Sequence, residues 1–210
     1  MNTRILGWAL MGVVALVAAC GGDSMAEAPA AEPMAEAEPA AAAAEPAGQT
    51  MMLGGGTATE VHPGQAGSPH VKVDWVVNGA NISITYGRPF LKGRVVGDSV
   101  EPTSESVWRL GADEATTLVA GSDMMFRDSH IPAGEYTLWT THMNDEFHLI
   151  INSQTGQWGT QYDSSQDVAH VTMDVGELDS PAEQLTLSIG DGTFSFDWGA
   201  MTASVPIMVH

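Results

Sequence analysis

Cysteine and positive charge are both scarce in this sequence. A single cysteine in 210 residues excludes an intrachain disulfide and any zinc site built from several thiolates. Lysine and arginine number 7 against 26 acidic residues, so nothing offsets the repulsion of a phosphate backbone. The stability of the chain must therefore come from an apolar core, and nucleic acid is excluded as a partner.

Membrane-spanning hydrophobic runs are also lacking. The apolar run at residues 5–19 is shorter than the roughly 20 residues that a spanning helix needs, but it suits a signal peptide. Arg4 precedes it and Val17-Ala18-Ala19-Cys20 ends it, which resembles the lipobox of bacterial lipoproteins. We therefore expect a lipoprotein signal peptide over residues 1–19, and lipidation of Cys20, palmitate included, as the first mature residue.

Lipidation of Cys20 predicts where the protein resides. Acyl chains contribute roughly 0.8 kcal/mol per buried methylene group, and two or three of them anchor a protein stably. We expect an exported protein that is attached to the bacterial cell envelope through this membrane anchor. Gly21, rather than an aspartate, follows the cysteine and favours the outer membrane if the cell is Gram-negative.

Residues 20–69 are rich in Ala, Glu, Pro and Gly and contain a loose repeat, MAEAPAAEP at 25–33 echoed by MAEAEPAAA at 34–42. Such a segment buries too little apolar surface to repay its ordering entropy. We predict a disordered, acidic tether with a reach on the order of 40 Å. The folded domain is then expected over residues 70–210.

From residue 70 the sequence changes to short alternating runs separated by turn residues. Val73 and Trp75 alternate with polar neighbours, Asn78-Gly79 follows, and Ile82 and Ile84 alternate again, which predicts a hairpin. No window sustains the 3.6-residue apolar period of a helix. We predict an all-β fold, a two-sheet antiparallel sandwich or a jelly-roll-like barrel. Further strands are expected at 115–120, 123–127, 135–141, 146–152, 168–174, 184–189, 193–198 and 201–207.

A series of short motifs follows along this domain: Tyr86-Gly87-Arg88-Pro89, Lys92-Gly93-Arg94, Trp108-Arg109-x-Gly111-Ala112-x-Glu114-Ala115-Thr116, Pro132-Ala133-Gly134-x-Tyr136, Asn152, Gln157-Trp158-Gly159 and Tyr162-Asp163. In this order they resemble the DUF2911 family over about residues 70–208. The resemblance implies a β-sandwich-like fold and a lipid-anchored or secreted bacterial protein, but no chemistry, because the function of that family is unknown. Asp167-Val168-Ala169-His170 departs from the family pattern Asp-Val-Leu-Arg and lacks its positive charge.

The few basic residues are clustered. Arg88, Lys92, Arg94 and Arg109 fall within residues 88–109, where even spacing over the domain predicts about one. One interpretation is a site for a small anionic or carbohydrate ligand, because guanidinium groups bind carboxylate or phosphate in bidentate fashion. The other, which the excess of acids favours, is that these arginines pair with local carboxylates and hold a loop against the sheets.

Aromatic and acidic residues near this cluster complete the candidate site. Tyr86, Trp108 or Trp158 are candidates for an apolar wall, and the two tryptophans for stacking on a sugar ring. The interpretation that Trp158 covers the end of the sandwich stays open beside this. Arg109 and Glu114 are the best candidates for a functional pair, because their motif places both near a tryptophan and a bend. Trp75, Trp139 and Trp198 lie in alternating runs and are expected in the core.

A hydrolase acting on an envelope component is the first alternative function. Gly97-Asp98-Ser99-Val100 resembles the nucleophile block of GDSL-type esterases, and Asp167 and His170 follow in the right order. Those enzymes have a parallel α/β sandwich, whereas this sequence predicts no helices. The second alternative is a purely structural or interaction domain without a small ligand.

No metal site and no cofactor are expected. His142 and His148 flank a predicted turn, but no spacing brings two imidazoles and a carboxylate to one face. Strand alternation predicts that His148 points to solvent. His62 and His70 are assigned to the tether and its end.

Overall fold

The computed structural model describes residues 50–65, 67–103, 106–143 and 146–210. These residues form antiparallel strands and one short 3₁₀ turn, so the predicted all-β fold is confirmed. Within the described ranges, no helix has the length and apolarity needed to cross a membrane. The elements are β1 (Thr50–Leu53), β2 (Gly56–His62), β3 (His70–Val77), β4 (Ala80–Gly87), β5 (Val107–Trp108), β6 (Thr116–Ala120), β7 (Met124–Phe126), β8 (Ser129–Ile131), β9 (Gly134–Met143), β10 (Glu146–Asn152), η1 (Ser164–Gln166), β11 (Asp167–Gly190) and β12 (Thr193–Val209).

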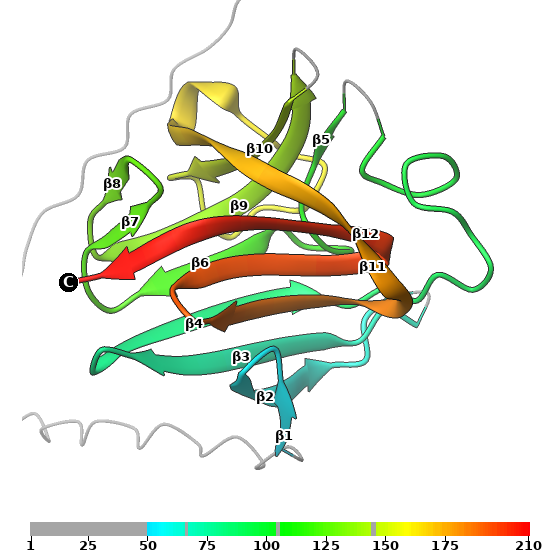
Figure 1. Cartoon of the computed structure of the whole chain (residues 1–210), viewed down its shortest axis with the longest axis horizontal. Coiled ribbons are helices and arrows are strands. Elements are labelled where there is room, and N and C mark those ends of the chain that lie inside the picture. The colour runs from blue at the N-terminus through cyan, green and yellow to red at the C-terminus, as the bar shows by residue number, and fades with distance from the viewer. Residues whose placement is uncertain (1–49, 66, 104–105, 144–145) are drawn as a thin grey trace, which may run out of the picture. The chain divides into compact units, whose positions relative to one another are not determined.

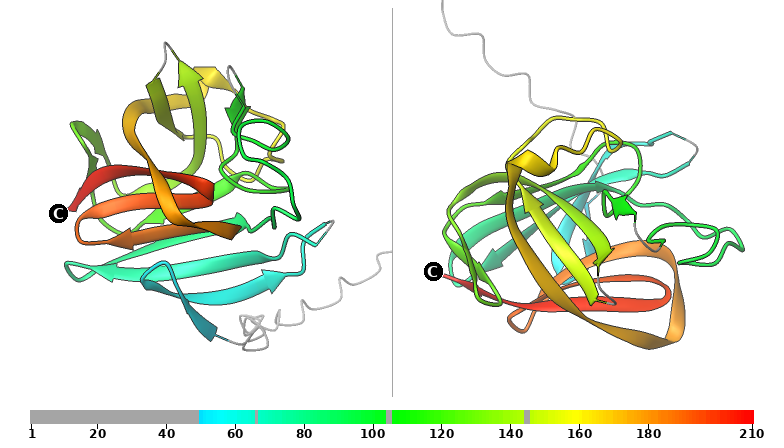
Figure 2. Two further views of the ribbon diagram at one scale, coloured as in Figure 1. Left: turned by 45° about the vertical axis from the view of Figure 1, so that its right-hand side comes forward. Right: turned by 90° about the horizontal axis from the view of Figure 1, so that it is seen from above.

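The strands form one continuous antiparallel path that folds over itself (Figures 1 and 2). Its order is β1-β2-β3-β4-β6-β9-β10-β11-β12-β7-β8, with β5 pairing β9 at the side. The path bends back over itself within β11. The register of β11 against β12 shifts between Glu177 and Ala182 and again between Ala182 and Thr186. β-bulges of this kind bend a strand and increase its twist, so β11 carries the path from one layer to the other. The result is a sandwich-like sheet that is not closed into a barrel.

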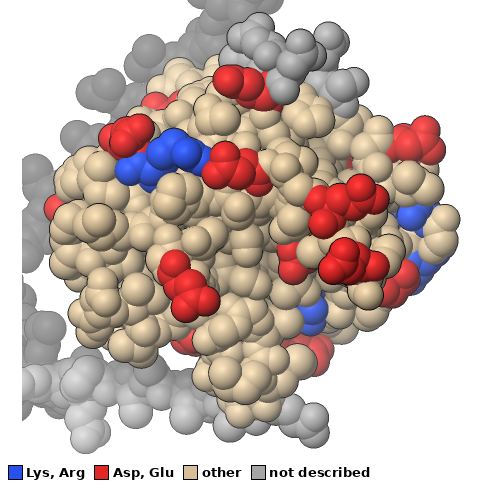
Figure 3. Space-filling model, viewed as in Figure 1, with Lys and Arg blue, Asp and Glu red and all other residues tan. Residues whose placement is uncertain are grey.

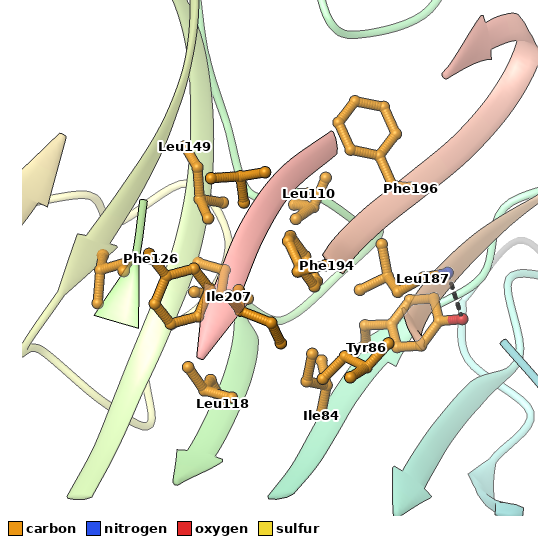
Figure 4. Close-up of a cluster of buried hydrophobic side chains, with 14 of the residues drawn as sticks. Ile84, Tyr86, Leu110, Leu118, Phe126, Leu149, Leu187, Phe194, Phe196 and Ile207 are labelled. Carbon is orange, nitrogen blue, oxygen red and sulfur yellow. Dashed lines mark hydrogen bonds between the residues drawn. The ribbon is translucent and has the colours of Figure 1, made fainter. Parts of the chain in front are cut away.

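The core lies between the two layers and is built by alternation along the strands (Figure 4). Ile84 and Tyr86 of β4 meet Leu187 of β11 and Phe194 of β12, and all four side chains are buried. The Tyr86 hydroxyl accepts a hydrogen bond from the Leu187 N–H at 3.1 Å and thus joins the layers. The expected core tryptophans are all buried: Trp75 and Trp198 belong to this core, whereas Trp139 lies in a separate small cluster with Ala115 and Ile150.

The hairpin at Asn78-Gly79 is confirmed. Val77 faces Ala80 across a two-residue loop in which both residues have positive φ, 51° at Asn78 and 84° at Gly79. This is the conformation of a type I′ turn, whose twist matches that of the flanking strands. Asn78 also donates from its side chain to Val209 O at 3.3 Å, which links the turn to β12.

Two expectations about element boundaries are corrected. The strands predicted at 168–174 and 184–189 belong to one strand, β11, and those at 193–198 and 201–207 both belong to β12. In addition, β1 and β2 lie inside the segment assigned to the tether. Ala58 of β2 is fully buried against β3, so the folded domain begins well before residue 70. A small side chain such as alanine fills the core here without a strong hydrophobic signal.

Cys20, the signal peptide and the repeats at 25–42 lie outside the described residues. Their predicted roles stay predictions.

Candidate functional site

The loop between β5 and β6 is held in a tight conformation by side chains that bond to its backbone carbonyls. The Trp108 indole donates to Gly111 O at 3.1 Å, and the buried Thr116 hydroxyl donates to Leu110 O at 3.0 Å. Leu110 and Asp113 both have positive φ, 51° and 62°. These left-handed residues reverse the chain within a few positions. The Trp108 motif is therefore a compact bend in which Arg109, Asp113 and Glu114 keep partly exposed side chains.

The motif around Gln157 packs directly on this bend. Ala115 N donates to Gln157 O at 3.3 Å, and Gly159 N donates to Asp113 O at 3.0 Å. A Cβ atom at Gly159 would lie 1.8 Å from Arg109 Cδ, so the arginine side chain occupies the space that the glycine leaves. Two motifs that lie far apart in the sequence thus form one structural unit.

A pocket of about 530 Å³ opens beside this unit, and we call it the basic pocket. Three of the four clustered basic residues line it, together with aromatic rings from separate elements. Acidic side chains outnumber basic ones over the face shown in Figure 3, so this local gathering of basic residues runs against the charge of the molecule. Its charged and aromatic lining residues are Lys92, Arg94, Arg109, Glu101, Asp113, Phe90, Trp108 and Trp198.

Arg109 is the least satisfied charged group of the basic pocket. Its Nη1 reaches Gly159 O at a long 3.4 Å, and its buried Nε has no hydrogen-bond partner. Among the described residues no carboxylate forms an ion pair with it. Burial lowers the pKa of Arg109, while the charges of Asp113, Glu101 and Glu114 oppose that shift. Because arginine stays protonated in proteins, a cation with unused donors lines the pocket.

The acidic groups of the pocket, in contrast, have partners. Glu101 Oε2 accepts from Thr103 N and from the Ser106 hydroxyl, both at 2.6 Å. Burial on its own would raise the pKa of Glu101, but these hydrogen bonds and the charge of Arg109 outweigh it and lower the pKa. Asp113 Oδ2 accepts from Gln65 N at 2.8 Å. The carboxylates are therefore engaged in holding loops.

Arg88 and Tyr86 lie away from the basic pocket and have structural contacts. Arg88 is 8% exposed; its Nε donates to Leu185 O at 3.0 Å and its Nη2 to the Thr186 hydroxyl at 3.2 Å. Both partners belong to β11, and both are neutral oxygens. The expected pairing of Arg88 with a local acid is therefore wrong. Burial raises the pKa of Tyr86, and its hydroxyl is used by Leu187.

The remaining aromatic candidates are placed differently from each other. Trp108 is 5% exposed and lines the basic pocket, whereas Trp158 is 37% exposed and does not line it. Trp158 pairs through its backbone with Glu114. Arg94 donates to Phe90 O and Leu91 O, which keeps it on the rim of the pocket. The ligand-binding role of these residues stays a prediction.

A second pocket, of about 230 Å³, is lined by Tyr86, Glu114 and Gln157, which belong to three of the sequence motifs. We call it the histidine pocket. His62, His70 and Glu114 line it, and His70 Nε2 is 2.7 Å from Glu114 Oε2. A Cβ atom at Gly87 would lie 2.8 Å from the His70 ring and 2.5 Å from Ala112 O, so this glycine makes room for the histidine. His62 and His70 end β2 and begin β3, which corrects their assignment to the tether.

The spacing of histidines along the sequence does not predict this group, because its members lie on three segments that meet only in the fold. The signal that could have found it is the glycine at position 87, which the Tyr86 motif contains without a turn to explain it.

The esterase arrangement is not present in the described residues. Ser99 Oγ accepts from Val95 N at 2.8 Å and donates to Val95 O at 3.2 Å, within its own turn. The His170 imidazole bonds instead to Asp167 at 2.8 Å. No described imidazole contacts the Ser99 hydroxyl, and a nucleophile requires such a base within hydrogen-bond reach.

The expected exposure of His148 is corrected as well. Its side chain is 14% exposed and its Nδ1 is buried without a hydrogen-bond partner. It lies between Thr141 and Thr172, its partners on the two neighbouring strands. His142 packs edge-on against Phe147 at 4.9 Å between ring centroids.

The comparisons with known proteins agree with the motifs. The family model described as "Protein of unknown function (DUF2911)" matches residues 68–207. No curated protein and no solved structure is similar enough to match. The matched range holds β3 to β11 and most of β12, with nearly every residue that lines the two pockets. The chain therefore belongs to the DUF2911 family.

Proposed function

We propose that the domain binds a small anionic ligand in the basic pocket, with Arg109 as the principal contact. The observation that carries this proposal is the state of Arg109, a half-buried cation whose Nε lacks a partner and whose guanidinium pairs with no described carboxylate. Leaving a buried charged donor unsatisfied is costly, so a ligand that supplies an acceptor to this donor would bind favourably. A carboxylate or phosphate group accepts the two parallel N–H bonds that a guanidinium offers.

The size and walls of the basic pocket suit a small molecule. Its volume of about 530 Å³ falls within the range of common ligand pockets. Trp108, Trp198 and Phe90 give it an apolar side, while Lys92 and Arg94 add positive charge. A sugar acid combines a carboxylate for Arg109 with a ring face for the tryptophan, so it unites the two ligand classes that the sequence suggested.

The proposal predicts that an anionic ligand raises the melting temperature of the full-length protein through Arg109. A ligand at one hundred times its dissociation constant stabilises the folded state by about 2.7 kcal/mol. A thermal-shift screen with inorganic phosphate, dicarboxylates and uronic acids should therefore contain compounds that stabilise the wild type. Arg109→Ala should lose this shift.

Arg127→Ala is the matched control, because Arg127 is exposed and already paired with Asp174 at 2.7 Å. It should keep the full shift. Equal stabilisation of the Arg109 variant, or no stabilisation of the wild type by any compound, would overturn the anion site. The second result would favour a purely structural or interaction domain.

We also propose that the domain is held at the bacterial cell envelope by acyl chains on Cys20. The lipobox-like sequence and the position of the chain's single cysteine support this. When the full chain is expressed in a bacterium, mass spectrometry should find a diacylated N-terminal cysteine, and the protein should partition into detergent. Cys20→Ser should leave the protein in the aqueous phase. An unmodified Cys20 thiol on the wild type would contradict the proposal.

A further inference from the structure

The geometry points to a divalent metal site of the zinc class formed by His62, His70 and Glu114. The three residues come from the end of β2, the start of β3 and the bend before β6. One ligand atom from each lies within 4.8 Å of the other two. The histidine pocket shares no lining residue with the basic pocket, so this inference does not depend on the proposed anion site.

The donor set has the chemistry that zinc prefers. Two imidazoles and one carboxylate form a common three-residue zinc set, in which the fourth position stays open for water or a ligand. His70 Nε2 is 2.7 Å from Glu114 Oε2, and His62 Nε2 is 3.8 Å from Glu114 Oε1. The two rings stack with centroids 4.2 Å apart and planes inclined by 20°, so the two imidazoles lie side by side next to the carboxylate.

His70 is oriented as a ligand would be. It is 2% exposed, and its Nδ1 lies 3.1 Å from Ser68 O, which can accept a hydrogen bond from that nitrogen. The Nε2 lone pair then faces Glu114 Oε2 and Ala112 O, the latter at 3.0 Å. Metal-ligating histidines are commonly fixed in this way by a carbonyl on their other nitrogen.

The electrostatics at Nε2 call for a positive species. If His70 is neutral and donates from Nδ1, its Nε2 carries a lone pair. That lone pair then faces two further acceptors, Ala112 O and Glu114 Oε2. Glu114 Oε2 is itself buried, and although it lies 2.7 Å from Nε2 the contact does not have the geometry of a hydrogen bond. Acceptors that converge in this way repel one another unless a proton or a metal ion lies between them. A metal ion at this position would also be bound by His62, whereas a proton between His70 and Glu114 would leave His62 without a role.

Gln157 is the candidate partner for a water molecule at the fourth coordination position. Gln157 lines this pocket and is 8% exposed. Its amide nitrogen donates to the Thr137 hydroxyl at 3.1 Å, but its Oε1 is buried without a hydrogen-bond partner. Buried polar atoms are seldom left unpaired. A water molecule on the metal ion would supply the donor that this oxygen lacks.

His62 is the ligand that must adjust. Its Nδ1 accepts from Gly64 N at 3.1 Å, so in the metal-free form a neutral ring carries its proton on Nε2. Coordination through Nε2 moves that proton to Nδ1 and opens the contact with Gly64. The His62 side chain is 42% exposed and free of the core, so the ring can turn. The Gly64 amide is then a local reporter of binding.

Titration of the full-length protein with Zn²⁺ and Co²⁺ tests the site. We expect saturable binding of one equivalent, visible absorption bands of a low-symmetry Co²⁺ complex, and a shift of the Gly64 amide resonance. His62→Ala and Glu114→Gln should each weaken binding at least about tenfold. Both side chains are nearly half exposed, so these variants should fold, and circular dichroism verifies it.

His130→Ala is the matched control, because His130 is an exposed histidine 3.1 Å from Asp123, and no third ligand joins this pair among the described residues. It should bind as the wild type does. Binding that is unchanged in His62→Ala and Glu114→Gln would assign the metal to other surface groups and overturn the site. The absence of saturable binding would overturn it too.

Discussion

Replacing Arg88 with alanine is expected to lower the free energy of unfolding by about 3 kcal/mol, although this residue belongs to the basic cluster. Its guanidinium joins the end of β4 to β11 through Leu185 O and the Thr186 hydroxyl. Truncation leaves a buried carbonyl without its donor and a cavity where the stem packed. The backbone around it is tied to β11 as well, because Leu185 N donates to Pro89 O at 3.1 Å. Urea denaturation of the full-length variant measures the loss.

Arg127→Ala is a close control for this measurement. Arg127 makes the same pattern of contacts, from Nε to the carbonyl of Thr172 and from Nη2 to the side chain of Asp174, but at an exposed position. Exposed ion pairs contribute about 0.2–1 kcal/mol, so its loss should be small. Equal losses in the two variants would show that burial of Arg88 does not carry the effect. If Arg88→Ala kept the stability of the wild type but was no longer stabilised by anions, Arg88 would be part of the binding site.

The fold was largely predictable from the sequence because its strongest determinants are local. Alternation of apolar residues identified β3, β4 and β10, and Asn78-Gly79 identified the turn between the first two. The joining of segments into β11 and β12 was not predictable, because the polar stretch at 175–183 continues the strand outside the core. β2 escaped detection since its buried residue, Ala58, is as common in tethers as in cores.

The site was predictable in composition but not in arrangement. The cluster of basic residues directed attention to Arg94 and Arg109, and both line the basic pocket. The sequence could not show that Arg88, a few positions away, turns into the opposite layer, because this depends on where β11 folds over. It also could not bring His62 to Glu114, whose contact depends on the pairing of β2 with β3 and on the bend at Asp113.

Replacing Gly159 with alanine is the second change with a large expected effect. The new Cβ would lie 1.8 Å from Arg109 Cδ and 2.6 Å from Asp113 O. The arginine side chain must leave its position, and the backbone of the bend must shift because a carbonyl cannot turn away as a side chain can. Overpacking of this kind costs about 1–3 kcal/mol. Moving Arg109 should also abolish stabilisation by anions, as Arg109→Ala does.

Gly190→Ala separates this steric effect from the general cost of replacing a glycine in the sheet. Gly190 ends β11, and a Cβ atom there meets no atom within 4 Å. Neither glycine has a positive φ, so alanine can adopt the φ angle at both positions and the two variants differ in the space around the new Cβ. Gly190→Ala should therefore keep both stability and the anion-induced shift, since alanine also restricts the unfolded chain. If Gly159→Ala retained that shift, the guanidinium of Arg109 would not be the group that binds the anion, and Lys92 and Arg94 would have to bind it without Arg109.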